Sequence, residues 1–116
     1  MKNEFTLYIK FFDYLKYLHL LIHDFPKEYK YFLGNNIIDI AYTTIDNIIE
    51  ANNAPNNQKF EKIILTSIWF DKLKTRLKMA YELKLITQKK YGYLIKENIE
   101  IGTELSSWLS WAKKQA

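Results

Sequence analysis

Turn-forming residues are scarce in this chain. Its 116 residues include only three glycines and two prolines, so few reverse turns can form. A fold built from many short strands needs a turn about every ten residues, whereas a few long helices need far fewer. The composition therefore favours long helices, and the length suits one domain over residues 1–116.

Three breaks divide the chain into four segments. They lie at Pro26, in the asparagine-rich stretch 52–58 and near Thr87. Proline is tolerated in the first turn of a helix and breaks a helix interior, so Pro26 should open the second helix. The third helix should run from about Lys59 to Ile86, and Thr87 should cap the fourth. We therefore predict an all-α fold, an antiparallel up-down-up-down four-helix bundle.

The first segment carries two apolar stripes at helical spacing. A helix that is apolar over so wide an arc usually contacts more than its own bundle, which predicts a homo-oligomer. A tryptophan near a helix end can stack on bases but more often lies in a core or an interface. The stripes are Phe5, Tyr8, Phe12, Leu15 and Ile22, and Leu7, Phe11, Tyr14, Leu18 and Leu21. The predicted oligomer interface comprises Phe11, Tyr14, Leu18, Trp108 and Trp111.

The inward faces of the other helices are predicted from the same spacing. In the second helix they are Leu33, Ile37, Ile40, Ala41, Ile45, Ile48 and Ile49. In the third they are Ile63, Trp69, Phe70, Leu73, Leu77 and Ala80. In the fourth they are Tyr91, Leu94, Ile95, Ile99, Leu105, Trp108, Leu109 and Ala112.

Positive charge gathers in residues 72–90, although the formal net charge of the whole chain is only +4. On a helix, Lys74 and Lys78 share one face, and Lys72 and Arg76 share another. Two interpretations are open: a solvated face whose long side chains pass the core, or a surface that binds the phosphates of nucleic acid. The predicted nucleic-acid-binding residues in this segment are Lys72, Lys74, Arg76, Lys78, Lys84, Lys89 and Lys90.

Two further lysines follow the proline. Lys27 and Lys30 stand at the start of the second helix, where the helix dipole does not favour cations. In an up-down-up-down bundle the second and fourth helices start at the same end. We therefore predict that Lys27 and Lys30 extend the patch of Lys89 and Lys90 and belong to the same nucleic-acid-binding surface.

Other chemistry is weakly indicated. Cysteine is absent, which excludes disulfides and thiolate metal sites and fits a reducing compartment. His19 and His23 are four residues apart but have no convincing third ligand, so a metal-dependent enzyme ranks last. No catalytic motif or glycine-rich phosphate loop is identifiable.

Because charged residues interrupt the apolar N-terminal run, we expect no membrane span or signal peptide. We thus expect a cytoplasmic, non-enzymatic protein without metal or cofactor.

Three stretches carry a resemblance to a known family: FPKEYKYFLG, LKTRLKMAYELKLITQKKYGYL and IGTELSSWLSWAKK. Over about residues 10–114 the chain resembles the accessory variability determinant proteins of diversity-generating retroelements. The resemblance implies a four-helix bundle that assembles as a pentameric barrel and binds nucleic acid, RNA and possibly DNA. It also implies association with the retroelement's reverse transcriptase during mutagenic copying of template RNA into cDNA.

This chain departs from the family pattern at two places. Lys74 and Lys78 stand where the family usually has basic residues, often arginine, and lysine lacks the planar bidentate contact of arginine with phosphate. Ser106 and Ser107 stand where the family commonly has two glycines before the tryptophan. Because serine has a side chain and glycine has none, this difference affects how closely helices can pack at that point.

Two alternatives remain open. The same bundle occurs in proteins encoded by intervening sequences of bacterial large-subunit ribosomal RNA genes, which would make this chain a structural homo-oligomer. Their SIPxNIAEG-like segment is replaced here by DIAYTTIDNIIEANN. Alternatively, the basic surface docks an acidic protein partner instead of nucleic acid.

Overall fold

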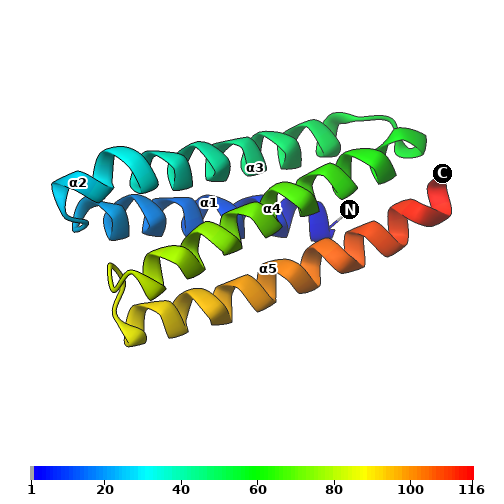
Figure 1. Ribbon diagram of the computed structural model, residues 1–116. Helices are drawn as coiled ribbons and strands as arrows, with labels where there is room; N and C mark the ends of the chain where they lie inside the picture. The colour runs from blue at the N-terminus through cyan, green and yellow to red at the C-terminus, as the bar shows by residue number, and fades with distance from the viewer. Residues whose placement is uncertain (1) are drawn as a thin grey trace.

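Four long helices lie side by side in the computed structural model, which describes the backbone of residues 2–116 and the side chains of residues 6–116 (Figure 1). They are α1 (Lys2–His23), α3 (Asn35–Asn53), α4 (Lys59–Glu82) and α5 (Gln88–Gln115). The short α2 (Lys27–Tyr29) and the π-helical turn η1 (Lys30–Gly34) lead directly into α3, and the 3-10 turn η2 (Asn56–Gln58) precedes α4. The described residues contain no strand, so the predicted all-α four-helix fold is confirmed. The predicted stripe residue Phe5 lies outside the described side chains.

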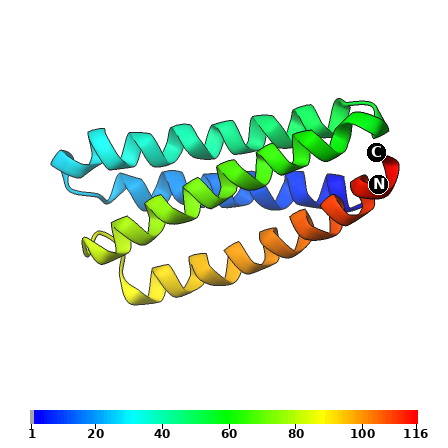
Figure 2. The ribbon, with the colours of Figure 1, turned by 45° about the vertical axis from the view of Figure 1, so that its right-hand side comes forward.

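Each long helix packs against two neighbours, in the circular order α1, α3, α4, α5. The bundle therefore has four flanks, which we name α1/α3, α3/α4, α4/α5 and α1/α5 after the helices that form them. The α1/α3 flank lies opposite the α4/α5 flank. The Pro26 end of the bundle holds the turns that precede α2 and α5, and the Pro55 end holds the turn before α4 and both chain termini (Figure 2).

One stripe of each helix fills a common core. In α1 this is the stripe of Leu7, Phe11, Tyr14, Leu18 and Leu21, each nearly or fully buried. Burying one such side chain contributes about 1.5–3 kcal/mol, so this stripe determines how α1 is rotated about its axis. The buried apolar residues of the other long helices are Ile37, Ile40, Ala41, Ile45, Ile48, Ala51, Ile63, Phe70, Leu73, Leu77, Ala80, Leu94, Ile101, Leu105, Trp108 and Ala112.

Three residues predicted to face inward are exposed instead. They are Ile49, Ile95 and Ile99, and Ile99 is 64% exposed. In α5 the inward positions run through Leu94, Asn98 and Ile101, which puts Ile95 and Ile99 one position off the buried stripe. The prediction for these isoleucines was wrong because a neighbouring apolar position on a helix is hard to separate from the true centre of the face by spacing alone.

The second helix starts at Lys27, immediately after Pro26, as predicted. It is not uniform, because η1 inserts a π-helical turn before α3. Gly34 ends this turn and lies against α1, where a Cβ atom would come within 2.7 Å of Cγ2 of Ile22. The close approach therefore requires a residue without a side chain at this position.

The third helix ends at Glu82 rather than at Ile86. Residues 83–86 form the turn that leads to α5, and Ile86 is buried there. The predicted cap is confirmed: the backbone N–H of Lys90 donates a hydrogen bond to Oγ1 of Thr87 at 3.2 Å. This bond satisfies one of the free N–H groups at the start of α5.

Lys59 is a buried lysine at the Pro55 end. Its Nζ donates hydrogen bonds to the carbonyl oxygens of Ala51 and Asn52 at 2.8 and 2.7 Å. Those carbonyls belong to the last turn of α3, where free C=O groups and the negative end of the helix dipole favour a cation. Lys59 therefore joins the start of α4 to the end of α3.

The α1/α5 flank combines a polar bond in the core with acids at the surface. The Tyr14 hydroxyl donates a buried hydrogen bond to Oδ1 of Asn98. Lys10 Nζ lies 3.7 Å from Oε2 of Glu100, whose pKa is lowered by a hydrogen bond with Glu97 and then by Lys10. Burial raises the pKa of Glu104 above its ordinary value, and Oε2 of Glu104 is buried without a hydrogen-bond partner among the described residues.

Replacing Lys59 with methionine keeps the apolar stem and removes both hydrogen bonds to α3. We expect Lys59→Met to lower the free energy of unfolding by about 1.5–3 kcal/mol, because hydrogen bonds from a charged donor are lost and the carbonyls stay buried. Urea denaturation followed by circular dichroism measures this. Lys62→Met, at a position on the same helix without those bonds, is the control, and equal midpoints for the two variants would contradict the assignment.

Glu104→Gln should raise the thermal midpoint at pH 7. The raised pKa means that the folded chain holds the Glu104 proton more tightly than the unfolded chain does, so ionisation at neutral pH costs folding stability. As the pH falls through the raised pKa, wild type becomes protonated and the two midpoints should converge near pH 4, about the pKa of an unfolded glutamate. Glu100→Gln is the comparison. Because the pKa of wild-type Glu100 is lowered, its ionisation does not cost folding stability, and this variant should not have a higher thermal midpoint. Midpoints that stay parallel across the pH range would contradict this account.

Candidate nucleic-acid interface

The basic residues of α4 divide between two flanks of the bundle. Lys74 and Lys78 line a groove on the α4/α5 flank, whereas Arg76 reaches α3. Leu73 and Leu77 are buried between the two sets, so the core positions force neighbouring basic residues apart. The prediction that Lys74 and Lys78 share one face is confirmed by the groove that both residues line.

The α3-facing side of α4 carries what we call the outer row, Trp69, Lys72 and Arg76. Lys72 Nζ lies 4.2 Å from the centroid of the Trp69 ring, at cation–π distance. Arg76 Nε donates a hydrogen bond to Oδ1 of Asn36 on α3 at 3.0 Å. Within the described part of the chain, neither Lys72 nor Arg76 has an acidic partner. The outer row therefore presents two cations beside an indole.

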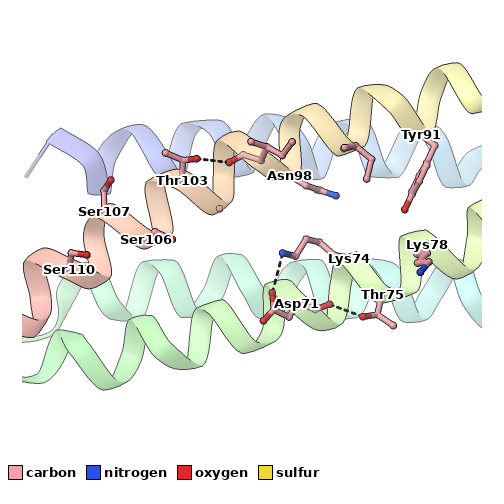
Figure 3. A pocket seen from close by; sticks show the side chains of 13 residues that line it. Asp71, Lys74, Thr75, Lys78, Tyr91, Asn98, Thr103, Ser106, Ser107 and Ser110 are labelled. Atoms are coloured by element: carbon pink, nitrogen blue, oxygen red, sulfur yellow. Dashed lines mark hydrogen bonds and ion pairs between the residues drawn. The ribbon is translucent and has the colours of Figure 1, made fainter.

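The α4/α5 groove has a volume of about 960 Å³. Lys74 enters it from α4 and pairs with Asp71 at 3.1 Å (Figure 3). Lys78 lies 3.9 Å from Oε2 of Glu82. The α5 wall consists largely of small or hydroxyl side chains. The lining residues of that wall are Tyr91, Ile95, Asn98, Ile99, Gly102, Thr103, Ser106, Ser107 and Ser110. Charge in this groove is thus partly neutralised by acids of α4 itself.

The remaining predicted lysines gather at the Pro26 end. Lys27 begins α2, and Lys89 and Lys90 lie in the first turn of α5. Lys90 Nζ is 3.9 Å from Oδ2 of Asp24, which precedes α2, so the prediction that both helices start at one end is confirmed. Lys30 follows in η1 and is partly buried.

Lys84, two residues after the end of α4, has an unusual backbone conformation. Its φ is +64°, in the left-handed region that glycine adopts without cost. The N–H of Lys84 bonds to the carbonyl of Tyr81, and the N–H of Leu85 bonds to that of Ala80, both at 2.9 Å. This pair of bonds is a Schellman motif, with lysine where glycine is usual. We call Lys27, Lys30, Lys84, Lys89 and Lys90 the end lysines.

Four of the five residues predicted at an oligomer interface are covered by their own chain. Phe11, Tyr14, Leu18 and Trp108 belong to the core, and Trp111 packs against it while partly exposed. The stripe of α1 that was assigned to the interface lies at the centre of the chain's own core. The other stripe of α1 reaches the surface, through Phe12. Spacing reveals two stripes but does not say which faces the partner helices.

The two histidines have different partners. The Nε2 of His19 and the hydroxyl of Tyr42 form a hydrogen bond of 3.0 Å, and His23 Nδ1 lies 3.5 Å from Asp24 Oδ1. Within residues 6–116 no group of three or more His, Cys, Asp or Glu side chains is placed to hold a metal ion. Nor does any helix in the described part of the chain have the length and apolar composition to cross a membrane.

Sequence reasoning missed two parts of the interface. Trp69 was predicted to face inward, but it is only partly buried and carries Lys72 over its ring. The Trp–Lys spacing of three residues was a usable signal, since residues three apart are neighbours on a helix. Asn36, which holds Arg76, is forty positions away in sequence and could not have been found from spacing.

Comparison with known proteins identifies the family to which this chain belongs. Neither the curated proteins nor the solved structures contain a match to this chain. The model of one family, described as bAvd-like, matches residues 6–112, which include all four long helices almost completely. The match also covers the outer row, the end lysines and the α4/α5 groove. The chain therefore belongs to the bAvd-like family.

Proposed function

We propose that this protein is a non-catalytic, nucleic-acid-binding accessory subunit of a diversity-generating retroelement. In this role it associates with the element's reverse transcriptase in the cytoplasm and supports mutagenic synthesis of cDNA from template RNA. Membership in the bAvd-like family supports the proposal. The role is one of binding and needs no catalytic group or cofactor of its own.

The outer row is the observation that best supports nucleic-acid binding. Lys72 and Arg76 are held in place by Trp69 and Asn36, and no acid among the described residues neutralises them. Preplaced cations lose less side-chain entropy when they bind phosphate. Because Lys72 lies over the indole ring, Trp69 contributes by positioning this cation. Two fixed cations without an acidic neighbour suit the phosphate backbone of a nucleic acid.

The end lysines extend this surface. Lys27, Lys89 and Lys90 sit in the first turns of α2 and α5, where the helix dipole opposes positive charge. Among the described residues Lys90 has an acidic neighbour, Asp24 at 3.9 Å, and the other end lysines have no ion pair. Cations kept at positions that the dipole opposes favour a role in binding a polyanion. We assign the phosphate contacts to the outer row and the end lysines. Lys74 and Lys78, which face the other flank and have acidic neighbours, should contribute less.

The active form is, in this proposal, a homo-oligomer and specifically a pentamer, as the family resemblance implies. Large apolar side chains remain exposed on a single chain, including Leu20 at 70% and Phe12 at 46%. Exposed apolar surface of this kind typically marks an interface. RNA, possibly DNA, and the reverse transcriptase are the other proposed partners.

The double substitution Lys72→Gln/Arg76→Gln should weaken binding of a single-stranded RNA. Each lost phosphate contact should flatten the slope of log affinity against log salt by about 0.7, so the double variant should lose about 1.4. Fluorescence anisotropy of a labelled RNA at several salt concentrations measures both quantities. The fold should persist, because exposed charges contribute only about 0–1 kcal/mol each.

Lys113→Gln/Lys114→Gln is the matched control. It removes the same charge from the last turn of α5, at the opposite end of the bundle from the end lysines. Lys74→Gln/Lys78→Gln should fall between the control and the outer-row variant. If the folded outer-row variant keeps both its affinity and its salt slope, the basic residues form a solvated face and docking of an acidic protein becomes the better hypothesis.

Lys84→Gly separates binding from stability. Because Lys84 has a φ of +64°, glycine should stabilise the fold by about 1 kcal/mol while removing one of the end lysines. We expect a higher thermal midpoint together with weaker RNA binding. Unchanged affinity in the stabilised variant would remove Lys84 from the surface.

A further inference from the structure

The face of α4 that carries the outer row continues toward the Pro26 end as an apolar surface. Arg76, the last member of the outer row, is followed at intervals of three and four residues by Met79 and Leu83. Residues at these intervals share one face of a helix. Met79 and Leu83 are both exposed, and Leu83 directly follows the last residue of α4. The cations of the outer row therefore lead into exposed apolar side chains.

A hollow of about 470 Å³ lies where this surface meets the start of the second helix. Its walls come from α2, from η1 and from the end of α4. The lining residues are Glu28, Tyr29, Phe32, Leu33, Met79 and Leu83. Five of these six are apolar or aromatic, a lining that is typical of sites for small organic groups. The hollow thus suits a flat, weakly polar group such as a nucleobase.

Phe32 supplies an open aromatic ring at this hollow. At 79% it is the most exposed of the large apolar side chains in the described part of the chain. Its ring has no aromatic or cationic partner among the described side chains, whereas the ring of Trp69 is covered by Lys72. A base can stack on an uncovered aromatic ring in a basic surface, and every base has a face that can do so.

The π-helical turn η1 sets the position of Phe32. Such turns inside helices frequently occur at functional sites. Phe32 precedes Asn36 by four residues, so the two are neighbours along the helix. Asn36 in turn accepts the hydrogen bond from Arg76. The open ring therefore lies next to the residue that positions the last cation of the outer row.

The charges at the hollow distinguish a base from a phosphate. Glu28 is the one charged residue among those that line it. Its carboxylate would repel a phosphate, but it can accept hydrogen bonds from the N–H groups of a base. Arg76, one helical turn before Met79, carries the opposite charge and suits the phosphate.

We propose that this hollow binds an unpaired base, with the ring of Phe32 as its stacking surface. The backbone of the strand then follows the outer row, and Arg76 contacts a phosphate beside the bound base. A base inside a duplex cannot enter, because its neighbours in the stack cover both of its faces. The proposal rests on the nucleic-acid binding proposed above and names the ligand class, a single strand with an accessible base.

Phe32→Ala should weaken binding of a single-stranded RNA by about 5- to 150-fold, the range that corresponds to one base–aromatic stack. The substitution removes no charge, so the slope of log affinity against log salt should stay that of wild type. Affinity for a fully paired RNA duplex, and for a strand of the same length without bases, should not change. Fluorescence anisotropy with the three labelled ligands at several salt concentrations measures these quantities.

Tyr31→Ala is the matched control. It removes an aromatic ring that is also exposed and also belongs to η1, but Tyr31 does not line the hollow. This variant should bind the single strand like wild type. Phe32→Leu keeps an apolar side chain without an aromatic ring and should lose affinity as Phe32→Ala does. It replaces Phe32→Ala if that variant does not fold, with folding judged by cooperative thermal unfolding.

Several results would overturn the base site. They are an unchanged single-strand affinity in folded Phe32→Ala or Phe32→Leu, an equal loss in Tyr31→Ala, and an equal loss on the strand without bases. In the first case the hollow becomes a docking surface for a protein partner. If Lys72→Gln/Arg76→Gln weakens RNA binding while Phe32→Ala does not, the proposed function stands without the base site. A wild type that binds no RNA would overturn both.

Discussion

Burial of one stripe of α4 decides where its charges go. Phe70, Leu73 and Leu77 are nearly or fully buried. Each contributes about 1.5–3 kcal/mol, whereas an exposed charge pair contributes about 0–1 kcal/mol. The core therefore sets the rotation of the helix, and the basic residues take whichever flank that rotation gives them. A run of alternating lysines, arginine and leucines becomes two surfaces separated by a core.

The same constraint applied to all four helices gives each flank its own character. The α3/α4 flank carries the outer row, and the α4/α5 flank a groove with paired lysines. The α1/α3 flank has an apolar hollow whose charged residues are Lys16 and Asp46, and the α1/α5 flank holds Lys10 beside a group of glutamates. Under the proposed function, the α3/α4 flank holds nucleic acid.

The Pro26 end shows that local stability is not the only factor shaping the turns. Lys84 occupies a left-handed position that glycine would fill at lower cost, and lysines lie in the first turns of both α2 and α5. Each choice costs folding stability by a modest amount, and each adds positive charge to the same end. Departures from the locally best residue are expected where a protein binds something.

The sequence by itself determined the helices, their order and most of their ends. Scarce turn formers, Pro26 and Thr87 act through local backbone chemistry, so their effects could be predicted from neighbouring residues. The separation of Lys74 and Lys78 from Lys72 and Arg76 likewise follows from the helical period. Only the tertiary structure decided which of two apolar stripes in α1 is central, that Ile99 is exposed, and that Asn36 holds Arg76. Those outcomes depend on contacts between helices far apart in sequence, and the spacing of residues within one helix contains no information about its neighbours.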